Sequence, residues 1–245
     1  MINLLKMEWY RLRHSRLFGG LLLGIFIAGL FIGASETEGQ AVASAAANGN
    51  GGVQLILQMM SEAVPMGFLA SIFGVIYLGQ GFAERTPNLA VESGAGRNAV
   101  FLSKTLTYLM VISLAMMIYI LAGVVIAAFT QNFAGEFLLR FNGLQIAVTF
   151  FMTGYAMCGM APLFLAIFRD AAKTTLLSIL ALMLHVFLAV SGNVLKGVQW
   201  YMPLNQMQAS ELGMAEWLTA IGIDFAFLVI PFLLGCLIFS KRELK

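Results

Sequence analysis

Six long runs of hydrophobic residues follow one another along the chain, separated by short polar segments. An α-helix needs about 20 apolar residues to cross the hydrocarbon of a bilayer, and each run is close to that length or longer. Because the runs are continuously apolar instead of alternating as barrel strands do, a membrane β-barrel is excluded. The pattern predicts an all-α polytopic membrane protein with six transmembrane helices, at residues 17–34, 63–82, 100–129, 144–168, 174–191 and 216–240.

The third run is longer than a membrane crossing requires. A helix of about 30 residues at ~1.5 Å per residue measures ~45 Å, compared with ~30 Å for the hydrocarbon core. We therefore expect this helix to tilt or to project, with the end that carries Lys104 extending toward the cytoplasm.

Residues 1–16, which precede the first run, have a helical pattern of their own. The apolar and basic residues fall on different faces of a helix: Ile2, Leu5, Trp9 and Leu12 on one, and Lys6, Arg13 and Arg16 on others. This pattern predicts an amphipathic interface helix on the inner leaflet. The helix serves either as an anchor to anionic lipid or as a contact with a partner protein, in which Trp9 and Arg13 take part.

The few charges are distributed unevenly among the connections between spans. The formal net charge is +2, from 14 Lys and Arg against 12 Asp and Glu, which is too balanced for a nucleic-acid-binding protein. Basic residues gather in the leader, in the second and fourth connections and in the C-terminal tail, and only Arg140 and Lys196 fall elsewhere. The positive-inside rule therefore places both termini in the cytoplasm.

Composition and motifs argue against an enzyme. The chain is 60% hydrophobic and 11% charged, so six spans leave no room for a soluble catalytic domain. It has no G-x-x-x-x-G-K-[ST] phosphate loop and no H-E-x-x-H zinc motif. Cys158 and Cys236 lie inside apolar runs, where they are expected to be small buried hydrophobes. We expect no catalytic, cofactor-binding or metal site on this chain.

Two connections are expected on the outer side of the membrane. Residues 35–61 are rich in Gly, Ala, Ser, Asn and Gln, a composition that predicts a loose loop. Residues 192–215 carry Trp200 and Tyr201 among polar residues, which suits an external segment at the outer interface.

The connection between the second and third spans, residues 83–97, contains signals for a short cytoplasmic helix. Thr86 suits the N-cap, Pro87 suits the first helical position, and Gly94 or Gly96 suits a left-handed C-terminal residue. A helix of about two turns is not stable alone in water. It must rest on the membrane surface, on the ends of the spans or on a cytosolic protein.

Two ionisable residues lie within spans, where charges are costly. Asp224 in the sixth span either lines a substrate route, pairs with another helix or reaches the outer interface. His185 lies midway along the fifth span. A neutral imidazole bonded to a neighbouring helix is favoured there over a proton relay, since the sequence places no second ionisable residue beside it.

This layout resembles the permease subunit of a type-2 ABC exporter (the ABC-2 type transporter permease family). Residues 3–16 are similar to the family's first helix, which is acidic, aromatic and basic in turn and ends near Ser-Arg. The segment Ser93-Gly94-Ala95-Gly96-Arg97, followed by Phe101-Leu102-Ser103-Lys104, resembles the family's S-G-x-x-R stretch and the Lys-bearing start of the next span.

The resemblance implies that two such permeases pair, as a homodimer or with a sister subunit, in a bacterial plasma membrane. A separate cytosolic ABC ATPase would carry ATP and Mg. A helix in 83–97 would couple to that ATPase through Arg85, Thr86, Leu89, Glu92 and Arg97. An amphipathic or apolar substrate, whether peptide, lipid or drug, would pass along the dimer interface, which in the family is lined mainly by the second and fifth spans.

Two other classes of protein stay open from the residues alone. A gradient-driven secondary transporter would use Asp224, His185 or Glu62 as its ion-coupling site and would transport without a partner. An immunity protein would bind a toxic peptide at the outer loops without moving it. A capped helix in a cytoplasmic loop has no evident use in either class.

Overall fold

The structure, a computed structural model, describes residues 2–39, 42, 51–61, 64–83, 90–92, 94–130, 141–190, 201–202 and 213–241. Within these residues the secondary structure is helical and no β-strand occurs, which confirms the all-α prediction. The helices are α1 (Ile2–Arg13), α2 (Arg16–Glu36), α4 (Gly51–Ser61), α5 (Val64–Ala83), α7 (Arg97–Thr130), α8 (Phe141–Cys158), α9 (Met160–Phe168), α10 (Ala171–Val190) and α12 (Met214–Lys241).

Five helical segments are long and apolar enough to cross a membrane, so the chain is a multi-pass membrane protein. The segments are Arg16–Glu36, Arg97–Thr130, Leu144–Phe168, Ala171–Ala189 and Met214–Lys241. The remaining predicted span corresponds to α5, a helix of 20 residues that contains the shorter apolar stretch Leu69–Gly81.

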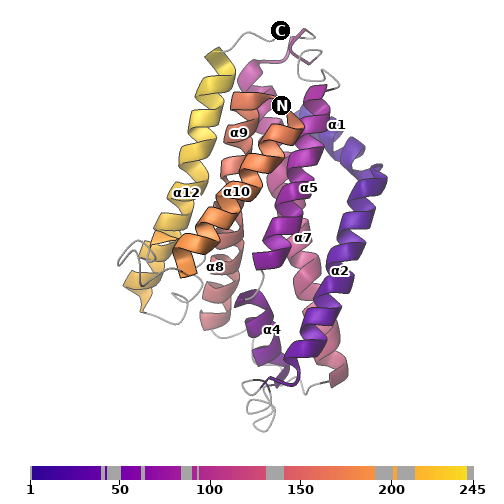
Figure 1. The fold of residues 1–245 in the computed structure, drawn as a ribbon, viewed down its shortest axis with the longest axis vertical. Coiled ribbons are helices and arrows are strands. Elements are labelled where there is room, and N and C mark those ends of the chain that lie inside the picture. Colours follow the sequence, from indigo (N-terminus) through magenta and orange to yellow (C-terminus); the bar gives the residue numbers. More distant parts are fainter. Residues whose placement is uncertain are drawn as a thin grey trace.

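Helix α7 connects the two ends of an elongated bundle (Figure 1). It has 34 residues, which at ~1.5 Å per residue gives ~51 Å, so the long third helix is confirmed. It contacts α1 and α5 as well as α2, α4 and α12. Helix α1 and the C-terminal end of α12 both lie toward the upper end of the bundle, on opposite sides, and α4 lies toward the lower end (Figure 1).

The prediction of a loose loop over residues 35–61 is wrong for its second half, because Gly51–Ser61 forms α4. Leu55 and Met59 of this helix are fully buried and belong to the main apolar core. Met59 also reaches Gly33 and Gly123, whose missing side chains leave room for its sulfur. The prediction considered the composition of the whole connection, in which small and polar residues outnumber the apolar ones. The apolar face of α4 was therefore not recognised.

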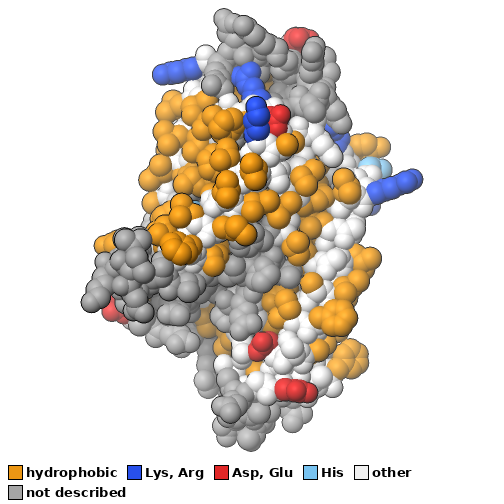
Figure 2. Space-filling model, in the orientation of Figure 1, with side chains coloured by type: hydrophobic (Ala, Val, Ile, Leu, Met, Phe, Trp, Pro, Cys, Tyr) orange, Lys and Arg blue, Asp and Glu red, His pale blue; other side chains and the backbone are white. Residues whose placement is uncertain are grey.

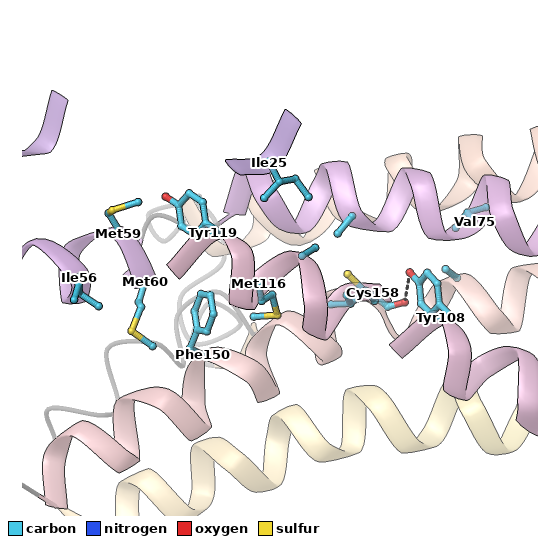
Figure 3. Packing of buried hydrophobic residues seen from close by; sticks show 14 of the residues in the cluster. Ile25, Ile56, Met59, Met60, Val75, Tyr108, Met116, Tyr119, Phe150 and Cys158 are labelled. Atoms are coloured by element: carbon cyan, nitrogen blue, oxygen red, sulfur yellow. Dashed lines mark hydrogen bonds between the residues drawn. The ribbon is translucent and has the colours of Figure 1, made fainter. Parts of the chain in front are cut away.

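The fourth predicted run is not one continuous helix, since a turn at Gly159 separates α8 from α9. Pro162 has no N–H group to bond the carbonyl of Cys158, four residues earlier. The hydroxyl of Tyr108 donates to that carbonyl at 3.2 Å, as Figure 3 shows, and also lies 3.1 Å from Ser71 Oγ. A side chain of α7 therefore satisfies the backbone group that the proline leaves without a partner.

Helices α2 and α7 approach closely through small residues. A Cβ atom at Gly29 would lie 2.8 Å from the Cβ of Ala122 and 3.1 Å from the ring of Tyr119. Lipid tails are as apolar as the side chains, so tight packing of this kind is what favours helix association in a membrane.

The surface of the bundle suits a bilayer. Hydrophobic side chains cover its middle in Figure 2, the visible Lys and Arg side chains lie toward the upper end, and acidic side chains are found at both ends. Large apolar side chains remain exposed on several helices, including Phe31, Met117, Phe187 and Leu237. Exposed apolar area of this extent is expected where the surroundings are lipid.

Candidate functional site

Helix α1 turns only part of its apolar face toward the rest of the protein. Leu12 is fully buried, but Ile2 is 70% exposed and Trp9 38% exposed, and Arg13 is exposed as well. The buried polar residue is Glu8, which the sequence analysis did not single out. Leu12 packs with Phe18 and Val111, so the helix rests on α2 and α7 and turns Trp9 outward.

Glu8 is the centre of a buried polar cluster that joins three helices. Lys104 Nζ of α7 lies 2.9 Å from Glu8 Oε1, and both side chains are about 95% buried, with exposures of 5% and 4%. The hydroxyl of Tyr77 on α5 lies 3.1 Å from Glu8 Oε2 and 2.9 Å from the Glu8 carbonyl oxygen. We refer to Glu8, Tyr77 and Lys104 as the α1 junction.

The α1 junction adds a partner for Lys104 that the sequence did not indicate. Lys104 lies in the third helix, as its predicted bounds require, and although the positive-inside argument counted it among the basic residues around the second connection, it is paired inside the protein. A buried charge persists when its partner and hydrogen bonds compensate for lost hydration. An acidic residue in the leader and a lone lysine at the start of a span were the only signals in the sequence.

The expected ATPase-coupling segment is described only in part. Arg85, Thr86 and Leu89 lie outside the described residues, whereas Glu92 is exposed. Gly94 has φ +95, and the Gly94 N–H bonds the Val91 carbonyl at 2.9 Å, which matches the left-handed stop predicted at this glycine.

Arg97, the remaining coupling candidate, is the first residue of α7. Its Nη1 donates to the carbonyl of Ser240 at 3.4 Å, so the start of α7 meets the last turn of α12. This contact brings the end of the second connection next to the C-terminal helix.

Asp224 is fully buried between α12 and α8 and does not reach the outer interface. Its Oδ2 accepts a hydrogen bond from Thr153 Oγ1 at 2.9 Å, which realises the pairing of helices that the sequence left open. One helical turn away on α8 and two turns away on α12, Trp217 Nε1 donates to Thr149 Oγ1 at 2.9 Å. Hydrogen bonds between side chains of neighbouring helices thus recur along this seam, and we call these four residues the α8–α12 seam.

His185 bonds its own helix instead of a neighbouring one, which corrects the prediction. Its Nδ1 lies 2.7 Å from the carbonyl oxygen of Ala181, four residues earlier. Its ring meets Phe227 of α12 edge to face, with 5.6 Å between ring centres. Its contact with α12 is thus aromatic, and the hydrogen bond from α8 reaches Asp224, not His185.

Groups that could ligate a metal are dispersed over the part of the chain that the structure describes. No cluster of three or more His, Cys, Asp and Glu side chains occurs there. Cys158 and Cys236 are free thiols; the first is buried and the second half-buried, close to what the sequence predicts.

We predict that Thr153→Val destabilises the protein by about 1–3 kcal/mol, because it removes the donor to a carboxylate that is already buried. The other oxygen, Asp224 Oδ1, has no hydrogen-bond partner among the described residues. Unfolding in mild detergent would measure the change. Thr219→Val is the control, since that hydroxyl bonds its own helix at an exposed position. Equal stability of the two variants would show that the bond to Asp224 contributes nothing.

No protein-family model matches this chain, and no curated protein sequence is significantly similar to it.

Proposed function

We propose that this chain is the membrane-spanning permease subunit of a type-2 ABC exporter. In this proposal it crosses the plasma membrane six times, with both termini in the cytoplasm. It pairs with a second permease, couples to a separate cytosolic ATPase, and moves an amphipathic or apolar substrate such as a peptide, a lipid or a drug.

One observation carries the proposal: the two sequence segments that resemble this family lie against each other. The leader helix contributes Glu8, and the Lys-bearing start of the third span contributes Lys104. They are 96 positions apart in the chain and meet in a buried ion pair at 2.9 Å. A functional link between the leader helix and the second connection would require this kind of contact.

The α1 junction supplies a route for mechanical coupling. Residues 83–97 connect α5 to α7, and Tyr77 and Lys104 belong to those two helices. When the ATPase closes on this connection, the junction would make α1 follow the ends of α5 and α7. The leader helix then stabilises the relative position of the two helices that receive the force.

The arrangement of the helix ends supports the proposed topology. Arg97, Arg169 and Lys241 lie on three helices that meet at one end of the bundle, where Arg97 contacts Ser240 and Arg169 contacts the ring of Phe239. If α5 also spans the membrane, so that the five long helices and α5 make six spans, that end of the bundle faces the cytoplasm under the positive-inside rule.

Co-purification tests this proposal directly. The full chain is isolated from its native membrane in mild detergent, and the associated proteins are identified by mass spectrometry together with vanadate-sensitive ATP hydrolysis. We expect a stoichiometric ABC ATPase. Leu89→Asp, or charge reversal at Arg85 and Glu92, should detach or uncouple it while the permease still inserts in the membrane.

Asn98→Asp is the matched control, because it adds a negative charge at an exposed position just beyond the same connection. It should leave the ATPase bound. If the permease purifies without an ATPase, or if Leu89→Asp behaves like Asn98→Asp, the exporter proposal or its coupling helix is wrong.

A second candidate function is a gradient-driven transporter, and the burial of Asp224 favours it. A carboxyl group with one neutral donor and a second oxygen without a partner could exchange a cation or a proton. This class predicts transport by the purified chain alone, driven by an ion gradient and abolished by Asp224→Asn. Binding of a peptide that depends on neither ATP nor a gradient would instead indicate an immunity protein.

A further inference from the structure

An apolar pocket of about 180 Å³ lies between α7, the α8–α9 turn with α9, and α12. Its walls come from all of these segments: Leu102 and Leu106, Gly159 and Pro162, and Leu228 and Phe232. It is distinct from the α1 junction and from the α8–α12 seam, since it includes no residue of either.

The chemistry of the walls restricts what can fill this pocket. No polar atom contributes to its surface, and the hydroxyl of Thr105 is turned into its own helix, where it donates to the Phe101 carbonyl at 3.0 Å. Apolar cavities of similar size stay free of water and accept apolar molecules, because water needs two or more polar partners. In a bilayer, the hydrocarbon available to a pocket at the surface of the bundle is the acyl chain of a lipid.

The helix crossing beside the pocket is closely packed. Pro231 has no N–H group to bond the carbonyl of Phe227, and a Cβ atom at Gly159 would lie 2.8 Å from that oxygen. Glycine therefore permits the α8–α9 turn and α12 to touch backbone to backbone. Because this contact is between backbones, rearrangement of side chains cannot easily bring the helices closer and close the adjoining pocket.

Each helix that lines the pocket reaches the same end of the bundle with a basic residue. Arg97 begins α7, Arg169 follows α9, and Lys241 ends α12. Arg97 bonds the carbonyl of Ser240, and the Arg169 guanidinium carbon lies 5.8 Å from the centre of the Phe239 ring. Asp170 is the adjacent acidic residue, and its carboxylate accepts the backbone N–H of Lys173.

The spacing between the basic end and the pocket fits a phospholipid. Leu102 follows Arg97 by five residues and Phe232 precedes Lys241 by nine, which at ~1.5 Å per residue gives ~8 Å and ~14 Å. The headgroup layer of a bilayer is about 5–8 Å thick on each side, so these distances place the pocket in the hydrocarbon. Stacking of Phe101 on both Phe232 and Phe239, at 6.1 and 5.4 Å, joins the two regions.

We propose that this pocket binds an acyl chain of an anionic phospholipid whose phosphate is held by Arg97 and Lys241 at the adjoining helix ends. Basic groups attract anionic lipid at a membrane surface, and the pocket adds a fixed place for the chain. This inference does not depend on the exporter proposal, because it needs only a bilayer around the helices.

The test uses the full chain in nanodiscs that contain chain-labelled spin probes of phosphatidylglycerol or phosphatidylcholine. Wild type is expected to immobilise phosphatidylglycerol preferentially. Arg97→Gln and Lys241→Gln should each reduce this preference about five-fold, the effect of ~1 kcal/mol per basic residue. Leu106→Trp fills the pocket, so neither labelled lipid should be immobilised there and the preference for phosphatidylglycerol should be lost.

Met117→Trp is the control for Leu106→Trp, since it places the same ring on an exposed part of α7 outside the pocket. If Leu106→Trp does not fold, Val229→Phe fills the same pocket from α12. The proposal is overturned if wild type retains both lipids equally, if the filled pockets behave like Met117→Trp, or if the glutamine variants keep the full preference.

Discussion

Glu8→Gln is expected to lower the free energy of unfolding by about 3–5 kcal/mol, the range for removing one partner of a buried ion pair. The substitution is nearly isosteric and keeps a polar group for the Tyr77 hydroxyl. It leaves the buried Lys104 side chain, which is 5% exposed, without its carboxylate partner. The loss therefore comes mainly from the missing attraction between the two charges, and reversible unfolding in mixed micelles would measure it.

The double variant Glu8→Gln/Lys104→Met separates this explanation from simple loss of packing. With both charges removed, most of the stability should return, because the desolvation cost disappears together with the attraction. Lys6→Met is the control, since it removes an exposed charge from the same helix and should change stability by no more than about 0.5 kcal/mol. A double variant no more stable than Glu8→Gln would contradict the ion-pair explanation.

The α1 junction also gives the exporter proposal a consequence beyond stability. If α1 transmits the movement of the second connection, Glu8→Gln should reduce substrate-stimulated ATP hydrolysis even at temperatures where the protein stays folded. Lys6→Met should leave that stimulation intact. Equal stimulation in both variants would restrict Glu8 to a structural role.

Gly79→Val is expected to destabilise the protein by about 3 kcal/mol, at the upper end of the range for overpacked cores. A Cβ atom at Gly79 would overlap the Cβ of Ala171 and would lie 2.6 Å from the Cα of Ala171. The second of these atoms belongs to the backbone of α10, so no rotamer change can relieve the overlap. Helices α5 and α10 would have to move apart.

Gly24→Val is the matched control, because a Cβ atom there meets nothing within 4 Å. It should be neutral within about 0.5 kcal/mol, as expected for a surface position. Adding Ala171→Gly to Gly79→Val should recover only part of the loss, since the backbone contact persists. If Gly79→Val and Gly24→Val unfold alike in detergent, the close crossing of α5 and α10 does not exist in solution.

The positions of the helices could be predicted because they depend on local properties of the chain. Hydrophobic runs of sufficient length are favoured in a bilayer wherever they occur, and a helix satisfies its own backbone. The left-handed stop at Gly94 is equally local, because only glycine adopts that conformation without strain. The break between α8 and α9 could have been predicted from Pro162 by the same reasoning, but the apolar run concealed it.

The partners of Glu8 and Asp224 could not be predicted, because they lie on helices 96 and 71 positions away. Which faces meet depends on the rotation and register of each helix, and hydrophobicity does not distinguish these when both lipid and side chains are apolar. The pattern of α1 identified its apolar residues but not which of them protein would cover: Leu12 is buried against α2 and α7, whereas Ile2 and Trp9 stay exposed.

The sequence by itself therefore determined that this is an all-α membrane protein, where its long helices lie, and where its basic residues gather along the chain. The tertiary structure decided that α4 packs against the core, that Tyr108 bonds the carbonyl opposite Pro162, and that Glu8 pairs with Lys104. The physical reason is that transfer into a bilayer depends on local hydrophobicity. Pairing between helices depends instead on close packing and on buried polar groups finding donors and acceptors on other helices.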